Sequence, residues 1–342
     1  MEKKIKLSML IVFIVACIIP SGNIFSQNDA NTIMTIIKNK KDYPDYYLVA
    51  AHRGYWANYP ENSEGAYLAA IAIGADIVEM DVRLTSDDVM VVFHDACLDR
   101  VTTGSGKLRD QPYSYVRNLH LKMTDGRVTQ ERMLTLDNAL NLLKRKAVVS
   151  IDIKETGALF NSTMIRVLQM LNQKDMLSQS IVKGKMTRNQ LQQNVLSQTG
   201  MTLADFVYTP IAFSNTANLN SYIQDFVDGG DIYAFEMVYK TSWDKAILDW
   251  IPYLQQRNIW IGQYSFWPET EYGVFAEGIP LKDCNPIMRN YKFKDKPDSL
   301  PQDWDDGRGD WDWLFSKGAD YVISDRGELL IDYLELVGKR TK

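Results

Sequence analysis

Residues 74–95 have the sequence GADIVEMDVRLTSDDVMVVFHD, which contains two apolar runs typical of β-strands. The first run covers residues 76–82 and the second covers residues 89–93. Residues 86–88 make up most of the connection between the two strands. Because a parallel crossover needs about a dozen residues, this short connection predicts an antiparallel hairpin.

Apolar runs of the same kind recur along the chain between amphipathic segments such as residues 63–73 and 136–144. They cover residues 47–51, 148–153, 181–183, 206–211, 232–235, 259–262 and 321–323. Strands that alternate with helices predict a parallel sheet with the helices outside it. About eight such units over roughly 300 residues predict a single α/β domain, a TIM (β/α)8 barrel made irregular by the hairpin.

The composition argues against nucleic acid as a partner. The chain has 342 residues, of which 46% are hydrophobic, enough for one large core. Its formal net charge is −5, and it contains no long block of basic residues that would attract a polyanion. A small-molecule partner is therefore favoured, and the sequence leaves the oligomeric state open.

The first residues have the layout of a signal peptide. Lysines between residues 3 and 6 precede an apolar run over residues 7–20 and a polar segment over residues 21–27. The run is too short to span a bilayer as a helix of about 20 residues. We therefore expect export, with cleavage that removes residues 1–26. Lipoprotein processing at Cys17 is the alternative, and the apolar residues that follow Cys17 argue against it.

After this leader, residues 27–46 form a lead-in and residues 47–335 form the barrel domain. Within the domain, residues 264–317 are rich in Pro, Gly, Asp and Trp, which predicts a long ordered loop over one barrel face. The cysteines that remain are Cys97 and Cys284, so one disulfide is possible but no framework can be inferred. No Cys/His spacing indicates a structural zinc site.

Two carboxylates interrupt the first strand of the opening stretch. Glu79 and Asp81 are two residues apart and so lie on one face of the strand. Two buried carboxylates this close repel each other unless a cation lies between them, which favours Mg²⁺ or Ca²⁺. In the alternative interpretation one carboxylate is solvated at the strand end and the other accepts hydrogen bonds from backbone amides.

The strand at residues 148–153 carries a second polar pair of the same spacing, Asp152 and Lys154. Asp152 could complete a three-carboxylate metal site, and Lys154 could contact an anionic ligand. A plain internal salt bridge between the two side chains is the alternative.

Two of the three histidines follow predicted strands, His52 after residues 47–51 and His94 after residues 89–93. Polar residues at the carboxyl ends of TIM-barrel strands point into the active site. Beside the acidic residues, this placement makes both histidines candidate catalytic groups.

Five ordered motifs resemble the signature of the glycerophosphodiester phosphodiesterase family. They are His52-Arg53-Gly54, Pro60-Glu61-Asn62, GADIVEMDV at residues 74–82, His94-Asp95 and Leu98-Asp99-Arg100-Val101-Thr102-Thr103. Weaker similarity follows in Thr135-Leu136, Asp152-Ile153-Lys154 and residues 318–326. The resemblance extends from residue 51 to residue 330 and is densest before residue 155.

This resemblance implies a TIM barrel that hydrolyses glycerophosphodiesters to glycerol 3-phosphate and an alcohol. It also implies a divalent cation held by Glu79, Asp81 and Asp152, with His52 and His94 as the acid/base pair. An imidazole with a pKa of about 6.5 can accept a proton from a nucleophile and donate one to a leaving alkoxide. Which histidine acts first as the base stays open.

The resemblance also implies roles for four further residues. Arg53 and Lys154 are expected to contact the substrate phosphate, while Glu61 and Asn62 are expected at the rim of the site or behind its ligands. The family usually has Glu where this chain has Asp152, so coordination or metal preference could differ. The segment Gln263-Tyr264-Ser265-Phe266-Trp267 replaces a Trp-Thr-Val-Asn-like segment of the family, which leaves the alcohol group unidentified.

Two other functions remain open. One is a lipid phosphodiesterase on the same barrel, similar to lysophospholipase D or sphingomyelinase D. The acidic character of residues 267–313 suits anionic lipid surfaces poorly. The other is a non-catalytic exported binding protein, which predicts loss of the catalytic residues, whereas both histidines and all three carboxylates are present.

Overall fold

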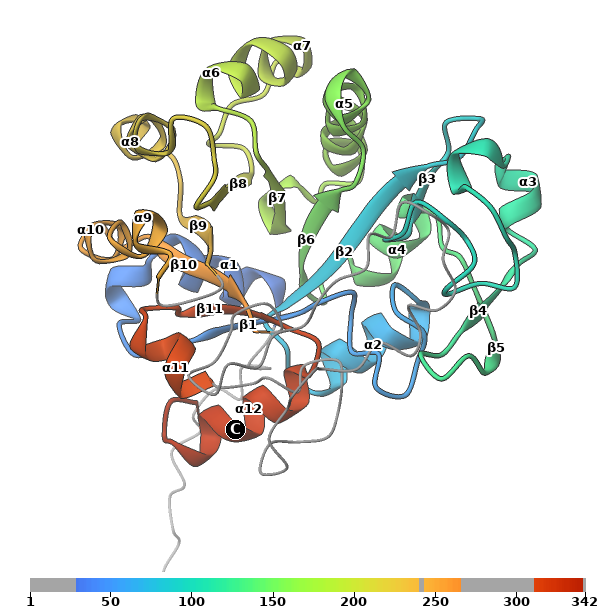
Figure 1. The fold of residues 1–342 in the computed structure, drawn as a ribbon, viewed down its shortest axis with the longest axis horizontal. Helices are drawn as coiled ribbons and strands as arrows, with labels where there is room; N and C mark the ends of the chain where they lie inside the picture. The colour runs from blue at the N-terminus through green and yellow to red at the C-terminus, as the bar shows by residue number, and fades with distance from the viewer. Residues whose placement is uncertain (1–28, 240–242, 266–310, 341–342) are drawn as a thin grey trace, which may run out of the picture.

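A closed barrel of parallel strands forms the centre of the fold in the computed structural model, which describes residues 29–239, 243–265 and 311–340 (Figure 1). The barrel strands are β1 Leu48–Ala51, β2 Ile77–Leu84, β6 Val148–Ile153, β7 Ser180–Gly184, β8 Val207–Phe213, β9 Ala234–Val238, β10 Trp260–Tyr264 and β11 Tyr321–Ser324. Each is parallel to its neighbours, and β1 pairs with both β2 and β11, which closes the barrel. The predicted TIM barrel is confirmed.

The predicted hairpin is also present. Strand β3 Met90–Val92 runs antiparallel to the end of β2, with Val82 opposite Val92 and Leu84 opposite Met90. A second antiparallel pair, β4 His120–Lys122 and β5 Val128–Arg132, was not predicted. Together with η2 Leu108–Asp110 and α3 Tyr113–Val116, this pair extends to one side of the barrel (Figure 1).

Helices cover the outside of the barrel between its strands (Figure 1). They are α2 Glu64–Ala72, α4 Leu136–Leu143, α5 Gly157–Gln173, α6 Arg188–Leu191, α7 Ser197–Thr199, α8 Leu219–Gly229, α9 Lys245–Leu248, α10 Ile251–Gln255, α11 Trp311–Ser316 and α12 Gly327–Leu336, with short turns at η3 Leu177–Gln179 and η4 Gln192–Leu196. The two helices expected at residues 63–73 and 136–144 are α2 and α4. The side chains of Ser63 and Thr135 accept hydrogen bonds from backbone N–H groups and so fix where these helices begin.

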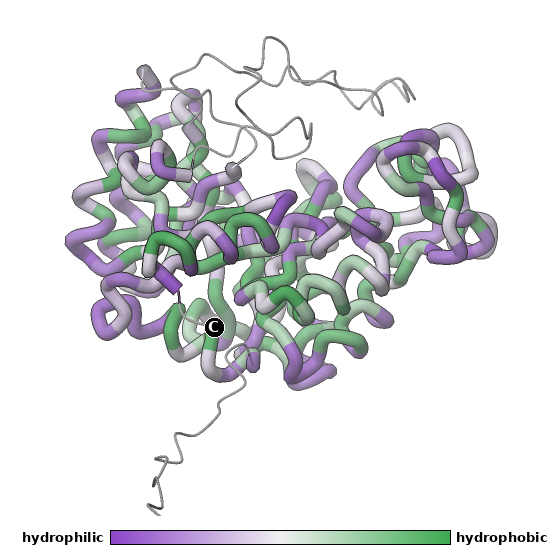
Figure 2. The backbone as a smooth tube through the Cα atoms, turned by 90° about the horizontal axis from the view of Figure 1, so that it is seen from below, coloured by the Kyte–Doolittle hydropathy of each residue, from purple (hydrophilic) through white to green (hydrophobic). Residues whose placement is uncertain are grey.

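The hydrophobic interior has two layers. The larger one lies between the strands and the outer helices, where hydrophobic residues recur among hydrophilic ones along the chain (Figure 2). The second lies inside the barrel and includes residues near the starts of several strands. Helix α1 Ala30–Lys38, which is followed by η1 Lys40–Asp42, contributes Ile33 and Ile37 to this second layer. The lead-in before β1 is thus packed into the barrel domain.

Several expectations concern residues at the edge of the described ranges or beyond it. The leader at residues 1–26 and residues 266–310 of the expected loop lie outside the described residues. Among the described residues of the range 264–317, Tyr264 ends β10 and Trp311–Ser316 form helix α11. Cys97 is disulfide-bonded. Among the helices in the described ranges, we find none with the length and apolar character that a membrane span requires.

Candidate active site

A cavity of about 780 Å³ opens at the carboxyl ends of the barrel strands. His52 and Arg53 follow β1, Lys154 follows β6, and Tyr264 ends β10. All four line the cavity, as do His94 and Asp152. In TIM barrels this end of the strands is the usual location of the active site.

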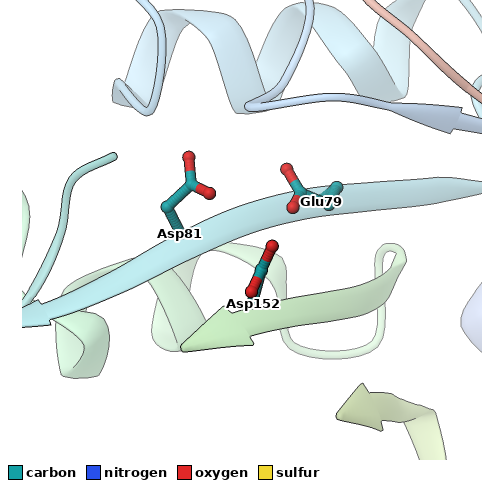
Figure 3. A group of neighbouring side chains, drawn as sticks. All are labelled: Glu79, Asp81 and Asp152. Atoms are coloured by element: carbon teal, nitrogen blue, oxygen red, sulfur yellow. The ribbon is translucent and has the colours of Figure 1, made fainter. Parts of the chain in front are cut away.

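The three expected metal ligands lie together (Figure 3), and one of them, Asp152, lines this cavity. Asp81 on β2 is directly opposite Asp152 on the neighbouring parallel strand β6. Glu79 lies two residues before Asp81 and so shares its face of the strand. One carboxylate oxygen from each residue lies within 4.8 Å of the other two. The sequence spacing therefore predicted the cluster because parallel strands in register place equivalent side chains beside each other.

Burial and neighbouring charges shift the pKa values of Glu79 and Asp81 in opposite directions. Glu79 and Asp81 are fully buried, which rules out the alternative in which one of them is solvated. Burial raises the pKa of Glu79 to about 7, against the opposing charge of Lys183. Burial also raises the pKa of Asp81, but the positive charge of Lys154 and other nearby cations outweighs it and holds this pKa well below its ordinary value. Without a metal ion, one member of the pair therefore keeps its proton until near neutral pH.

Two oxygens of the cluster have the character of open metal ligands. Glu79 Oε1 and Asp81 Oδ1 are buried and accept no hydrogen bond. Each has an ion-pair contact only, with Lys183 Nζ at 3.2 Å and with Lys154 Nζ at 3.0 Å. Carboxylate oxygens without hydrogen-bond donors suit a hard divalent cation, so the residues present fit Mg²⁺ or Ca²⁺.

Lys154 lies between two of these carboxylates. Its Nζ atom is 2.7 Å from Asp152 Oδ2 and 3.0 Å from Asp81 Oδ1. The internal salt bridge that was the alternative interpretation of Asp152 and Lys154 is thus observed. It does not compete with the site interpretation, because both residues also line the cavity. Burial raises the pKa of Asp152, but Lys154 and Lys183 outweigh it, so the pKa is lowered overall.

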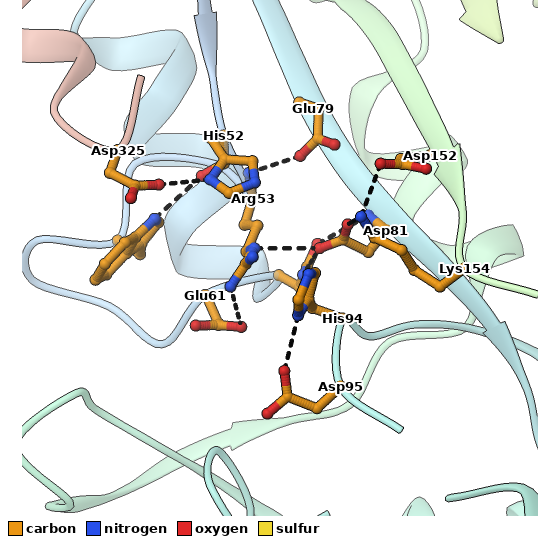
Figure 4. A network of polar contacts seen from close by, with 12 residues as sticks. His52, Arg53, Glu61, Glu79, Asp81, His94, Asp95, Asp152, Lys154 and Asp325 are labelled. Atoms are coloured by element: carbon orange, nitrogen blue, oxygen red, sulfur yellow. Dashed lines mark hydrogen bonds and ion pairs between the residues drawn. The ribbon is translucent and has the colours of Figure 1, made fainter. Parts of the chain in front are cut away.

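His52 is oriented by a carboxylate that the sequence reasoning did not assign to the site. Its Nδ1 atom lies 2.5 Å from Asp325 Oδ1, and its backbone carbonyl accepts a hydrogen bond from Trp56 Nε1 (Figure 4). With the Nδ1 proton directed at Asp325, Nε2 is the nitrogen that takes up or releases a proton. Burial, reinforced by the charge of Arg53, holds the pKa of His52 well below its ordinary value.

His94 has a carboxylate partner of its own. Its Nδ1 atom lies 2.8 Å from Asp95 Oδ1, and Arg100 Nε donates to Asp95 Oδ2 at 2.6 Å. Burial raises the pKa of Asp95, but Arg100 and His94 outweigh it and lower the pKa overall. Burial also lowers the pKa of His94. Both candidate catalytic histidines therefore have lowered pKa values, and the Nδ1 atom of each contacts a carboxylate.

The His52-Arg53-Gly54 turn brings Arg53 to the acidic cluster. Arg53 and Gly54 have φ values of 59° and 80°, and a Cβ atom at Gly54 would lie 2.8 Å from the backbone of Ala66. Only glycine suits both conditions at that position. The turn directs the Arg53 backbone N–H to Glu79 Oε2 at 3.0 Å and its guanidinium to Asp81 Oδ2 at 3.4 Å (Figure 4).

Glu61 and Asn62 lie behind these groups. Glu61 accepts hydrogen bonds from Arg53 Nη1 at 3.0 Å and from Arg100 Nη2 at 2.6 Å. Asn62 Nδ2 donates to Asp81 Oδ2 at 2.8 Å. Both side chains therefore hold site residues in place rather than lining the cavity themselves.

The sequence reasoning missed a buried polar cluster beside Glu79. Lys183 on β7 and Glu236 on β9 are fully buried, and Tyr264 on β10 is nearly so. Lys183 Nζ lies 3.4 Å from Glu236 Oε1 and donates to Tyr264 Oη at 3.1 Å, while Tyr264 Oη donates to Glu236 Oε2 at 2.8 Å. A signal was present, because Lys183 and Glu236 are single charges within apolar strands, as Glu79 and Asp81 are.

This barrel and its cavity define the class of the molecule, a TIM-barrel protein with a candidate hydrolytic site at the carboxyl ends of its strands. Residues 52–207 match the model of the glycerophosphoryl diester phosphodiesterase family. Over these residues the chain is similar to the glycerophosphodiester phosphodiesterase family.

Two relatives indicate how far the sequence similarity extends. The glycerophosphodiester phosphodiesterase of Caldanaerobacter subterraneus subsp. tengcongensis is 38% identical over 115 residues, covering 33% of this chain and 47% of the relative. Glycerophosphodiester phosphodiesterase 1 of Mus musculus is 37% identical over 108 residues, covering 30% of this chain and 33% of the relative. These matches span less than half the length of either relative.

Solved structures support the fold over most of the chain. A glycerophosphoryl diester phosphodiesterase from Parabacteroides distasonis has a TM-score of 0.64 at 18% identity, covering 91% of this chain and 93% of that one. An Oleispira antarctica phosphodiesterase in complex with the product sn-glycerol-3-phosphate has a TM-score of 0.56 at 17% identity. The match covers 86% of this chain and 98% of that one. At these identities the similarity shows the fold alone.

Proposed function

We propose that the protein hydrolyses glycerophosphodiesters to glycerol 3-phosphate and an alcohol. One observation carries this proposal: one cavity is lined by His52 and His94, by the cationic side chains of Arg53, Lys154 and Lys185, and by Asp152 of the buried carboxylate cluster. The family match over residues 52–207 supports it from the sequence.

A phosphodiester reacts slowly because its negative charge repels nucleophiles and its alkoxide leaves poorly. Arg53 and Lys154 line the cavity and would bind the phosphoryl oxygens through their positive charges. A divalent cation held by Glu79, Asp81 and Asp152 would neutralise further charge on those oxygens. The side chains of Glu61 and Asn62 would keep Arg53 and Asp81 in position.

His52 and His94 would divide the proton transfers. As a neutral imidazole, one of them accepts the proton of the attacking hydroxyl, and in protonated form the other donates to the departing alkoxide. Where the substrate has a free glycerol 2-hydroxyl, that group can attack phosphorus and release the alcohol. The resulting cyclic phosphate is then opened by water, which regenerates both histidines.

The proposal is tested by measuring product release from a panel of glycerophosphodiesters and lysolipids, with Mg²⁺ and Ca²⁺ compared. We expect glycerol 3-phosphate from one or more of the glycerophosphodiesters, loss of activity in EDTA, and recovery when the cation is returned. Hydrolysis of lysolipids alone would favour a lipid phosphodiesterase. Binding of the diesters without any hydrolysis would favour a non-catalytic binding protein.

We further propose that the protein is exported and loses residues 1–26. The support is the order of lysines, apolar run and polar segment at the start of the sequence. Expression of the full chain in a secreting bacterial host, followed by intact-mass measurement, should give a mature protein that begins at Gln27. A lipid-modified Cys17 at the new terminus, or an unprocessed chain, would contradict this.

A further inference from the structure

The cavity continues beyond the candidate catalytic groups. These groups lie on β1, β2 and β6 and on the loop after β3, whereas the cavity also reaches the ends of β7 and β8, the next strands around the barrel. We name this second part the lysine arm. It is defined by Phe160, Asn161, Lys185, Met186, Gln190, Asn194 and Phe213. It is the space that an alcohol group would enter when the phosphate lies beside Arg53 and Lys154.

The lysine arm carries a positive charge, and the carboxylates that line the same cavity, Asp152 and Glu155, lie outside the arm, at the end of β6. Among the residues that line the cavity from 156 to 213, within the described ranges, Lys185 is the charged one and no carboxylate occurs. Lys185 is exposed and interacts electrostatically with Asp152, Lys154 and Glu236, so its charge acts on the same space as the phosphate-binding groups. Three side-chain amides, from Asn161, Gln190 and Asn194, add hydrogen-bond donors and acceptors.

A cationic alcohol group such as choline would be poorly accommodated in this arm. Proteins bind quaternary ammonium groups over the faces of aromatic rings. The ammonium of Lys185 already lies 4.4 Å from the centre of the Phe213 ring. A second cation would meet Lys185 at that ring, and the described residues that define the arm include no carboxylate to offset the repulsion.

We propose that the lysine arm selects diesters whose alcohol group carries an anion, in particular a second phosphate, and disfavours those with a quaternary ammonium. This proposal rests on the phosphodiesterase function proposed above. Lys185 acts as the specificity-determining residue, and the three amides bind the remaining oxygens of the anionic substituent.

The test compares kcat/KM for 1,3-bis(glycerophospho)glycerol, glycerophosphoglycerol and glycerophosphocholine, whose alcohol groups are anionic, neutral and cationic. In the wild-type protein we expect kcat/KM to be highest for the substrate with the anionic alcohol group, lower for the neutral one and lowest for the cationic one. Lys185→Gln should lower the ratio of the anionic to the cationic substrate by roughly three- to tenfold, because partly exposed charge pairs contribute modestly to binding. Higher salt should lower the wild-type ratio in the same direction.

Lys146→Gln is the matched control. Lys146 is an exposed lysine just before the start of β6, at the opposite end of the barrel from the cavity, so the ratio should stay at the wild-type value. The proposal is overturned if glycerophosphocholine is the best substrate, or if Lys185→Gln and Lys146→Gln give the same ratio.

Direct binding separates this proposal from the function on which it rests. If no diester is hydrolysed, the proposed function fails, and calorimetry can still compare glycerol 1,3-bisphosphate with glycerophosphocholine as ligands. Tighter binding of the bisphosphate that weakens in Lys185→Gln would support the charge preference of the lysine arm. Equal binding of both ligands would overturn it.

Discussion

Lys183 Nζ lies 3.2 Å from Glu79 Oε1, and neither side chain is exposed to solvent. The same ammonium lies 3.4 Å from Glu236 Oε1. A buried ammonium between two buried carboxylates offsets charges that would otherwise be strongly unfavourable in the interior. Lys183 therefore stabilises Glu79, a buried member of the acidic cluster, while Asp152 of the same cluster lines the cavity.

The first prediction is that Lys183→Met strongly destabilises the protein. The substitution keeps much of the side-chain volume but leaves Glu79 and Glu236 buried without their shared cation. Removing one partner of a buried ion pair typically costs about 3–5 kcal/mol. Unfolding in denaturant, followed by circular dichroism, measures the change, and a loss of less than about 1 kcal/mol would show that the contact is dispensable.

A double-mutant cycle provides the control for Lys183. In Lys183→Met/Glu236→Gln one of the two stranded carboxylates is also removed, so the double variant should lose less stability than the sum of its single variants. Strict additivity would mean that Lys183 and Glu236 do not interact across the barrel.

The second prediction concerns the pH dependence of stability. Burial holds the folded-state pKa of His52 below its ordinary value of 6.5, so the unfolded chain binds the proton more readily. The contribution of His52 is fully present above pH 6.5 and is lost as pH falls toward the folded-state pKa. Between pH 7 and pH 5.5 the wild-type protein should lose about 1 kcal/mol more than His52→Gln.

His120→Gln is the control for this comparison, because His120 lies on β4 and does not line the cavity. Its pH dependence should follow that of the wild-type protein. If the stability of His52→Gln shows the same pH dependence as that of the wild-type protein, folding does not lower the pKa of His52.

The third prediction concerns metal binding. Asp152→Asn should raise the dissociation constant for Mg²⁺ or Ca²⁺ by at least about tenfold, since it removes one of three charged ligands from the site. The loss of stability should be small, because Asn keeps the shape of the side chain. Calorimetric titration measures the affinity, with Asp45→Asn on the exposed surface as control. An unchanged titration would remove Asp152 from the site.

Much of the barrel could be predicted because its strands are short apolar runs, and because the length of a connection indicates whether the two strands it joins are parallel or antiparallel. The short link at residues 86–88 was enough to predict the β2–β3 hairpin. The β4–β5 pair was missed because residues 128–132 alternate between exposed and half-buried positions and carry no apolar face. Helix α1 was missed because its role, packing against residues near the starts of the barrel strands, depends on residues far away in sequence.

The site residues also differ in how far the sequence could predict them. Glu79 and Asp81 were predictable from local spacing, and Asp152 was placed beside them by analogy of strand context. The partners that orient the histidines were harder to find, since Asp325 is 273 residues from His52. Lys183 and Glu236 were overlooked even though they interrupt apolar strands, because the resemblance to the family directed attention to its own motifs.

The central claim is that His52 acts in proton transfer at a site for glycerophosphodiesters, and it is tested most directly by comparing kcat of wild-type and His52→Ala proteins with Mg²⁺ or Ca²⁺ present. The substrate is the glycerophosphodiester that the wild-type protein hydrolyses fastest. Circular dichroism checks that both proteins are folded. Because general acid–base groups contribute typically 100- to 10,000-fold, we expect a loss of at least about 100-fold in His52→Ala, and likewise in His94→Ala. A folded His52→Ala protein that releases glycerol 3-phosphate at the wild-type rate would contradict the mechanism.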